Sequence, residues 1–286
     1  MSLQVKRLAH GLGAEVTGID LNEDVPAPTI ADVRKAWLQH QVLVFPGQDV
    51  APERHIAFSR QFGEIDPVSF GPRFRHPDHP EIMLISNKPQ KGQPSQTRNQ
   101  GRQWHSDTSF SLRPATGSLL HCLELPDVGG DTMFTNMYMA YDALSEVMKK
   151  MLEDLWAVHD STNTKDARKR DPEVLAELRK INPLVAQPVV RTHPETGRKA
   201  LYVSEGQTTH IVGMTDEESA AILGFLFEHA VQPEFIYRHR WSQHDIVMWD
   251  NRCAMHLAVR YDMTKTRHMH RTTLKGEPSG YLYQPQ

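Results

Sequence analysis

The fold can be predicted outward from one segment, residues 246–256, IVMWDNRCAMH. Its apolar run predicts a buried strand, the three polar residues after it predict a turn, and the remainder predicts a second strand. His256 is expected to point inward from that second strand. Short strands are also predicted on either side, within residues 235–241 and 268–274. The C-terminal part of the chain is therefore expected to be rich in β structure.

The rest of the chain adds short strands and a few helices, with no linker that separates two cores. Strands are predicted at 16–21, 41–45, 82–86, 185–192 and 200–203 and around His105, Leu119 and Thr132, and helices at 29–41, 52–62, 137–155 and 216–229. Many short strands with few helices favour a sandwich or barrel over a parallel sheet. We expect one mainly β domain with flanking helices, a jelly roll, over residues 1–286.

Bulk composition excludes several classes of protein. The formal net charge of −3 and the 23% of charged residues give no basic excess for binding nucleic acid. The sequence has no apolar run of about 18 residues to span a membrane and no apolar core of a signal peptide at its start. Its two cysteines, Cys122 and Cys253, cannot form a disulfide framework. A reducing, cytoplasmic location with no membrane partner is the simplest expectation.

Two polar segments interrupt the predicted strands. Residues 87–103 contain Pro, Gly, Gln, Asn and Ser without an apolar period, which is typical of a loop. Residues 162–179 carry charges of both signs and predict a second exposed excursion. Because functional groups often lie on such loops, both segments are candidate covers of an active site.

Trp104-His105-Ser106-Asp107 is the first candidate metal motif. On a strand, residues two apart share a face, so the imidazole and the carboxylate would lie side by side. The spacing alone is weak, because His76-Pro77-Asp78 repeats it in a region that reads as a turn. His256, inward on a distant strand, supplies a third ligand. Two histidines and one carboxylate form the facial triad of non-haem Fe(II) oxygenases, which leaves coordination positions open.

Arg267 and Arg271 are the candidate anion-binding residues. They share a face if this segment is a strand, and the planar guanidinium suits a carboxylate. A solvated edge strand is the alternative interpretation. A second alternative is a cupin-type metal site built on His268 and His270, which would leave the two arginines without a role.

Together these segments resemble the taurine and 2,4-dichlorophenoxyacetate dioxygenase family of Fe(II)- and 2-oxoglutarate-dependent enzymes. The similarity extends over nearly the whole chain, from residues 11–16 to residues 271–274. The motifs that carry it are Trp104–Asp107, the turn Gly129-Gly130-Asp131-Thr132, Trp249–Arg252 with His256, and Arg267 with Arg271. The family's fold is a double-stranded β-helix, which agrees with the jelly roll expected from the strands.

The resemblance also implies a set of ligands and the residues that hold them. The expected cofactors are Fe(II), 2-oxoglutarate as co-substrate, and O2. Position by position, it implies iron ligation by His105, Asp107 and His256, binding of the distal 2-oxoglutarate carboxylate by Thr132 and Arg267, and docking of the anionic group of the prime substrate at Arg271. No further side chain is required as a catalytic base.

Four more residues are candidates for contact with the substrate: Asp66, Ser69, Gly101 and Gln207. They occupy places where the taurine enzymes have other side chains, because Gly101 replaces an asparagine and Gln207 offers an amide where an aromatic ring is expected. A carboxylate such as Asp66 near a bound sulfonate would repel it. These departures argue against taurine itself as the substrate.

Tyr237–Trp241, Asp250–Cys253 and Arg260–Asp262 resemble the phenoxyacetate branch of the family. We therefore expect hydroxylation of a carbon next to a heteroatom in a small anionic, aryloxyalkanoate-like substrate, so that the product fragments. The first alternative is a dioxygenase of a sulfonate or alkyl sulfate ester. The alternative of another class is a non-catalytic module that binds or senses a small acid. Since family members commonly self-associate, a homo-oligomer is expected.

Overall fold

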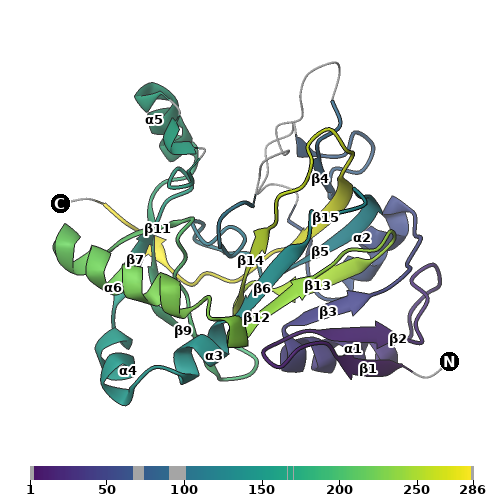
Figure 1. Ribbon diagram of the computed structural model, residues 1–286, viewed down its shortest axis with the longest axis horizontal. Helices are drawn as coiled ribbons and strands as arrows, with labels where there is room; N and C mark the ends of the chain where they lie inside the picture. The colour runs from purple at the N-terminus through teal and green to yellow at the C-terminus, as the bar shows by residue number, and fades with distance from the viewer. Residues whose placement is uncertain (1–2, 67–73, 90–100, 166, 170, 285–286) are drawn as a thin grey trace.

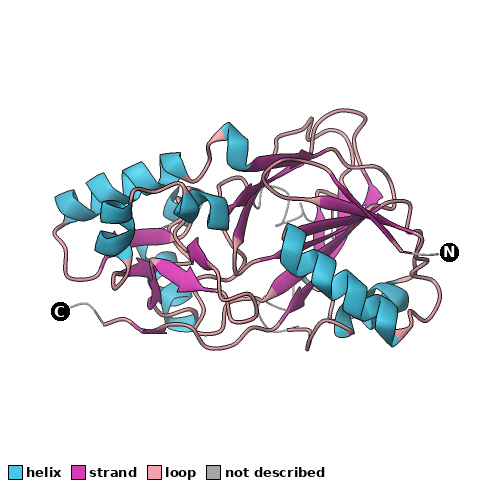
Figure 2. Ribbon diagram, turned by 90° about the horizontal axis from the view of Figure 1, so that it is seen from below, coloured by secondary structure: helices cyan, strands magenta, loops and turns pink. Residues whose placement is uncertain are grey.

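The computed structural model describes residues 3–66, 74–89, 101–165, 167–169 and 171–284. In these residues short strands are grouped into sheets in the middle of the molecule, and most of the helices lie toward its two ends (Figures 1 and 2). The predicted mainly β fold with flanking helices is confirmed at this level.

The largest sheet has seven strands. Only β2 and β3 pair in parallel, and every other neighbouring pair is antiparallel. The order across the sheet is β1 (Gln4–Arg7), β2 (Ala14–Thr17), β3 (Val42–Phe45), β13 (Ile246–Asp250), β5 (Gly117–Glu124), β15 (His268–Leu274) and β4 (Met83–Ser86).

Among the described residues, three smaller sheets complete the β structure. The three-stranded sheet has the order β12 (Ile236–His239), β6 (Thr132–Asn136) and β14 (Ala254–Ala258), and the two-stranded sheet pairs β10 (Lys199–Leu201) with β9 (Val190–Thr192). The four-stranded sheet has the order β11 (Thr208–Ile211), β7 (Trp156–His159), β8 (Val185–Pro188) and β16 (Tyr281–Leu282).

The stretch 246–256 forms the predicted strand, turn and strand. Its two strands do not pair with each other, because β13 lies in the seven-stranded sheet and β14 in the three-stranded sheet. The segment from β5 to β6 makes the same change of sheet, so the turn at Gly129–Gly130 is not the hairpin that it resembles in the sequence. Both turns carry the chain from one sheet to the other and place β14 next to β6.

In the part of the chain that the structure describes, six α-helices flank these sheets: α1 (Ala27–His40), α2 (Pro52–Arg60), α3 (Met137–Asp142), α4 (Glu146–Leu152), α5 (Pro172–Ile181) and α6 (Asp216–His229). Helix α6 begins at a capping box, in which Thr215 and Glu218 each bond the other's backbone N–H. Short 3-10 turns lie at Ala167–Lys169 and Pro233–Phe235.

Three apolar clusters hold the layers together. The central cluster lies between the seven-stranded and three-stranded sheets, where Leu120 and Val247 of the first meet Phe134 of the second. A second cluster packs α1 and α2 on the outer face of the seven-stranded sheet. The third joins α3 and α6 to the smaller sheets. Burial of apolar area at about 25 cal/mol per Å² drives each of these contacts.

The structure corrects several details of the sequence predictions. The single helix predicted at 137–155 is two helices, because Ser145 caps a new helix by accepting a hydrogen bond from the Met148 N–H. Residues 162–179 were predicted only as an exposed excursion, and they contain a 3-10 turn and most of α5, none of whose described residues is buried. Residues 90–100 of the other polar segment lie outside the described residues.

Among the residues that the structure describes, no helix combines the length and the apolarity needed to span a membrane.

Candidate metal centre

His105, Asp107 and His256 come together at one buried point. The Nε2 atoms of His105 and His256 lie 4.0 and 3.9 Å from the same carboxylate oxygen, Oδ1 of Asp107. The two imidazole rings are 4.2 Å apart between centroids. One ligand atom from each residue lies within 4.8 Å of the others. The predicted triad is therefore assembled from two segments that are about 150 residues apart in sequence.

Backbone hydrogen bonds between the two segments fix this approach. The N–H of His105 donates to the carbonyl of His256 at 3.2 Å, and the N–H of His256 donates back at 2.8 Å. This isolated bridge replaces the strand predicted around His105. Asp107 lies in the turn that follows, where Thr108 has a left-handed φ of 54°. The turn, and not strand alternation, aims the Asp107 carboxylate at the two imidazoles.

The three ligand atoms suit a transition metal. His105 Nδ1 lies 2.8 Å from the carbonyl of Gln103, which assigns the ring hydrogen to Nδ1 and directs the lone pair of Nε2 toward Asp107 and His256. Two imidazole nitrogens and one carboxylate oxygen form a donor set that Fe(II), Mn(II) and Co(II) accept. The residues present thus fit a bound divalent metal ion.

The electrostatics of the site favour cation binding. Burial lowers the pKa of His256 to about 3 and also lowers the pKa of His105, so both rings are neutral and able to ligate. Burial acts to raise the pKa of Asp107, but the Arg271 guanidinium and the two imidazoles outweigh it and hold that pKa below its usual range. Metal ligands must be deprotonated, and these three are.

Arg267, one of the two residues predicted to hold 2-oxoglutarate, contacts the segment that leads to the other, Thr132. Arg267 Nε donates to the carbonyl of Gly130 at 3.2 Å, and Thr132 opens strand β6 two residues later. The Thr132 hydroxyl accepts a hydrogen bond from the Trp241 indole N–H at 3.0 Å, which leaves its own hydrogen available to donate. Sequence reasoning did not identify Trp241 as the partner of Thr132.

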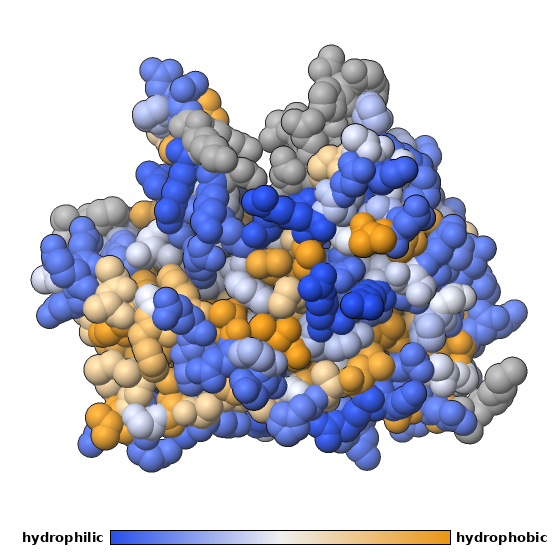
Figure 3. Space-filling model, in the orientation of Figure 1, coloured by the Kyte–Doolittle hydropathy of each residue, from blue (hydrophilic) through white to orange (hydrophobic). Residues whose placement is uncertain are grey.

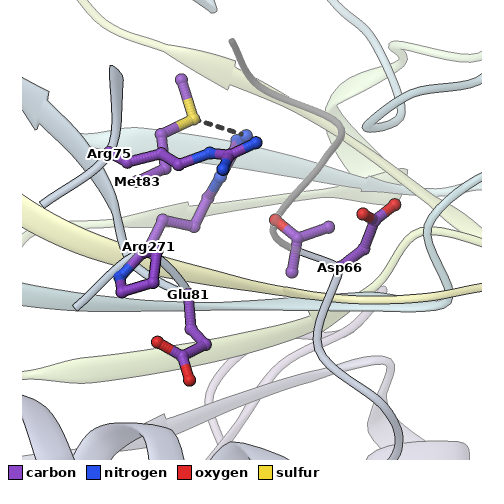
Figure 4. A pocket seen from close by; sticks show the side chains of 7 residues that line it. Asp66, Arg75, Glu81, Met83 and Arg271 are labelled. Carbon is purple, nitrogen blue, oxygen red and sulfur yellow. Dashed lines mark hydrogen bonds between the residues drawn. The ribbon is translucent and has the colours of Figure 1, made fainter. Parts of the chain in front are cut away.

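Arg271 reaches the metal motif and also lines a small pocket. Its Nη1 donates to Asp107 Oδ1 at 2.9 Å, and its Nη2 lies 3.2 Å from the Met83 sulfur. The pocket is also lined by Asp66 and Arg75. Figure 4 shows the guanidinium ends of Arg75 and Arg271 close together, with the Asp66 carboxylate on the other side of the pocket. Asp66 and Arg271, both expected from the sequence to contact the substrate, line one pocket, and Arg75 was not among the expected residues because no motif marks it.

The other predicted substrate contacts have different positions. Gly101 borders the triad, because a Cβ added there would lie 3.5 Å from Cε1 of His105. The Gln207 side chain accepts a hydrogen bond from Ser109, and Gln207 is not among the described residues that line the Arg271 pocket. Ser69 lies outside the described residues. In the orientation of Figure 1, the molecular surface is hollowed between α5 and β4, with strongly hydrophilic side chains inside the hollow (Figure 3).

Other candidate metal clusters have ordinary structural explanations. His193, Asp250 and Cys253 also lie within 4.8 Å of one another, but both oxygens of Asp250 already accept hydrogen bonds from Arg252 and one accepts from His193. His268 and His270 belong to no metal-binding group among the described residues, which argues against the cupin-type alternative.

The second copy of the metal motif behaves as the turn that was predicted. The imidazole of His76 accepts a hydrogen bond from the N–H of Asp78 at 3.2 Å, so this pair closes a local turn.

Comparison with known proteins places this site in a family. Residues 4–273 match the family model described as "Taurine catabolism dioxygenase TauD, TfdA family". The chain is 36% identical over 282 residues to the alpha-ketoglutarate-dependent 2,4-dichlorophenoxyacetate dioxygenase of Cupriavidus pinatubonensis, covering 96% of this chain and 98% of that protein. It is 30% identical to the alpha-ketoglutarate-dependent sulfate ester dioxygenase of Pseudomonas putida, covering 97% and 91%.

A solved structure supports the same relationship. AAD-2 in complex with Mn(II) and N-oxalylglycine aligns with a TM-score of 0.86 at 33% identity, covering 99% of this chain and all of that one. An enzyme family matched over nearly the full length argues against the non-catalytic module considered above. The chain therefore belongs to the TauD, TfdA family and is a 2-oxoglutarate-dependent dioxygenase.

Proposed function

We propose that this dioxygenase binds Fe(II) through His105, Asp107 and His256 and oxidises a small anionic substrate of the aryloxyalkanoate type. The observation that carries the proposal is the convergence of two imidazole nitrogens on one carboxylate oxygen at 3.9 and 4.0 Å. When bound, the iron supplies the redox chemistry that couples O2 and 2-oxoglutarate to oxidation of the substrate. The protein holds the metal, orients both organic acids and excludes water.

Thr132 and Arg267 are proposed to bind the distal carboxylate of 2-oxoglutarate. Arg267 is 5% exposed, and burial lowers the pKa of its guanidinium to about 10, so it stays charged at neutral pH. A buried cation of this kind is stabilised by an anionic partner. The Thr132 hydroxyl hydrogen provides a second, neutral donor, two residues after the Gly130 carbonyl that Arg267 contacts. One charged and one neutral donor suit the distal carboxylate of a diacid.

Arg271 is proposed to dock the anionic group of the prime substrate. Its guanidinium lies at the boundary between the metal motif and the pocket that Asp66 and Arg75 also line. An acid held there has a neighbouring carbon directed toward the metal ligands, and positioning of this kind accounts for much of catalysis. If that carbon also bears an ether oxygen, hydroxylation gives a product that breaks at the C–O bond.

An alkyl sulfate ester or a sulfonate is the second candidate substrate. The observation in its favour is the pair of guanidinium groups, Arg75 and Arg271, at one side of the pocket, because two cations suit a group with three acceptor oxygens. The carboxylate of Asp66 across the pocket opposes a second negative charge on the substrate. The similarity to the 2,4-dichlorophenoxyacetate dioxygenase favours the aryloxyalkanoate.

We also infer the wider setting of the site. The two sheets that enclose the central cluster are proposed to be the halves of a jelly roll in a single domain, and segments 87–103 and 162–179 are proposed to cover the active site. None of the described residues of helix α5, in the second segment, is buried. Movement of this helix over the site would therefore break no buried contact, which is what an active-site cover requires. A cytoplasmic homo-oligomer acting on a small molecule remains our expectation.

The metal assignment is tested by exchanging His105. Anaerobic addition of Fe(II) and 2-oxoglutarate to the wild-type protein is expected to produce a visible charge-transfer band, and His105→Ala is expected to abolish both this band and the release of succinate. Lys6→Ala, at an exposed edge strand, is the control and keeps both signals. Substrate-dependent succinate release by His105→Ala at the wild-type rate would refute the ligand assignment.

The substrate class is tested by measuring succinate release with matched panels of aryloxyalkanoates, alkyl sulfate esters and sulfonates. The highest kcat/KM is expected for an aryloxyalkanoate, with release of the corresponding phenol. A preference of tenfold or more for a sulfate ester or a sulfonate would replace the first candidate by the second.

A further inference from the structure

A chain of hydrogen bonds runs from the protein core to the Asp107 carboxylate. The Trp249 indole N–H donates to Asn251 Oδ1 at 2.9 Å, and Asn251 Nδ2 donates to the Ser118 hydroxyl at 3.1 Å. Ser118 Oγ in turn lies 2.7 Å from Asp107 Oδ2. The backbone N–H of Asp107 also donates to Asn251 Oδ1, at 3.2 Å. All four side chains are at most 4% exposed.

The direction of every link in this chain is determined. An indole N–H can only donate, so the oxygen of the Asn251 amide must face Trp249 and its NH2 group must face Ser118. The Ser118 hydroxyl accepts from that NH2 group and has one hydrogen of its own. This hydrogen points to Asp107 Oδ2, since an ionised carboxylate can only accept. Ser118 is 0% exposed, so bulk water does not compete for this hydrogen.

The two oxygens of Asp107 therefore have different roles. Oδ2 is held by Ser118, whereas Oδ1 lies close to both imidazole Nε2 atoms and accepts from Arg271 at 2.9 Å. We propose that Ser118, oriented by Asn251, is a positioning residue that fixes Asp107 as a one-oxygen ligand of the metal. A carboxylate free to rotate could present both oxygens and occupy a position that the co-substrate needs. This inference rests on the proposed role of Asp107 as a metal ligand.

Ser118→Ala removes the hydrogen bond without adding bulk. Loss of a partner of this kind around a metal ligand typically weakens metal affinity by roughly 10–100-fold. We expect the dissociation constant for Mn(II), measured on the full chain from the free Mn(II) signal in electron paramagnetic resonance, to rise about tenfold. Ser118→Thr retains a hydroxyl on the same carbon and is expected to restore most of the affinity.

Ser59→Ala is the matched control. Ser59 is another fully buried serine, on α2 against the outer face of the same sheet, where its hydroxyl contacts His55 and Thr272. Loss of the Ser59 hydroxyl should reduce the free energy of unfolding as loss of the Ser118 hydroxyl does, but it should leave the Mn(II) dissociation constant unchanged. If Ser59→Ala and Ser118→Ala weaken Mn(II) binding equally, the effect is general loosening of the sheet and the proposal is wrong.

A double-mutant cycle tests whether Asn251 acts through Ser118. Asn251→Ala alone should weaken Mn(II) binding, and the losses of the two single variants should be less than additive in the double variant, because without Ser118 the Asn251 side chain keeps only its direct bond from the Asp107 N–H. Additive losses would contradict the relay. If Asn251→Ala does not fold, the Ser118→Ala and Ser59→Ala comparison still decides the proposal.

The same titration separates this inference from the proposed function. If His105→Ala binds Mn(II) as tightly as the wild type, the metal site itself is misassigned. If His105→Ala loses binding while Ser118→Ala keeps the wild-type dissociation constant, the triad stands and the positioning role of Ser118 is wrong.

Discussion

Arg267 and Arg271 lie four residues apart, yet their guanidinium groups have different partners. Arg267 donates to the carbonyl of Gly130 and lies 6.0 Å from the ring centroid of Tyr261. Arg271 donates to Asp107 and contacts the Met83 sulfur. A shift in register next to His268, at the start of β15, accompanies this divergence. Arg267, just before β15, and Arg271, within it, therefore have different surroundings, as two separate anion sites would require.

Exchange of each arginine for lysine is predicted to separate the two binding roles. Lysine keeps the charge but loses the planar fork, so affinity for the bound acid should fall roughly tenfold. Arg267→Lys should raise the KM for 2-oxoglutarate, and Arg271→Lys should raise the KM for the prime substrate. Steady-state kinetics with each ligand varied in turn measures both effects. If both variants raise the same KM, the assignment of the two arginines is wrong.

The clustering of His105, Asp107 and His256 could be predicted from sequence, but the partners that support these residues could not. His105 and Asp107 form a local motif, and His256 follows a segment whose sequence pattern clearly predicts a strand and a turn. By contrast, Ser118 and Asn251 are 133 residues apart, and nothing in either local sequence marks the bond between them. Such contacts arise only when β5 and β13 pair in register, which a single sequence does not specify.

At the scale of elements, the turn before β6 is the point at which the chain changes sheets. Gly129 has a left-handed φ of 85°, and a Cβ added there would lie 2.8 Å from the backbone oxygen of Arg260. Gly197, in the turn between β9 and β10, has a similar φ of 69° but open space around it. The two glycines thus share backbone strain and differ in packing.

Gly129→Ala is predicted to destabilise the protein more than Gly197→Ala. A left-handed alanine alone costs roughly 1–2 kcal/mol, which Gly197→Ala should show in urea unfolding. Gly129→Ala adds a steric clash between the new Cβ and the backbone oxygen of Arg260, so that backbone has to shift. It should also raise the KM for 2-oxoglutarate, because the neighbouring Gly130 carbonyl accepts from Arg267. Equal losses of unfolding free energy with an unchanged KM would contradict this account.

Elements with clear boundaries were predicted well. Helix α6 and strand β15 have the predicted bounds, the first because Thr215 and Glu218 form a capping box. Strand β1 was missed because all four residues are exposed, so it shows no alternation and pairs through its backbone alone. Helix α5 was missed for a related reason, since it buries nothing and lies in a segment of mixed charge.

At the scale of the whole molecule, the seven-stranded sheet separates two chemically different regions. One face carries the central cluster and, through Asp107 and Arg271, the metal motif. The other face packs on α2, and three buried histidines lie at this side: His55 on α2, His121 on β5 and His270 on β15. The rings of His55 and His121 are 5.9 Å apart between centroids. These histidines do not contact the triad, so their charge affects stability and not ligation.

Acidification is predicted to destabilise the fold, and these three residues contribute to the effect together with other buried histidines such as His159. Burial, reinforced by neighbouring histidines, lowers the pKa of His55 and His270 to about 3 and that of His121 to about 4. In the unfolded chain each histidine has a pKa of about 6.5. Between these values the unfolded state binds more protons, so the stabilisation present above pH 6.5 is lost as the pH falls. Each group contributes on the order of 1 kcal/mol per pH unit.

Urea unfolding at pH 7.5, 6.5 and 5.5 measures this dependence. The free energy of unfolding should be nearly level above pH 7 and fall steadily below 6.5, and His270→Leu should give a shallower fall than the wild type. The buried carboxylates do not interfere in this range: the pKa values of Asp107 and Asp250 are lowered from 3.8, so their stabilisation is lost only at lower pH. A free energy that stays constant or rises from pH 6.5 to 5.5 would mean that these histidines are charged in the folded protein, with partners that offset their burial.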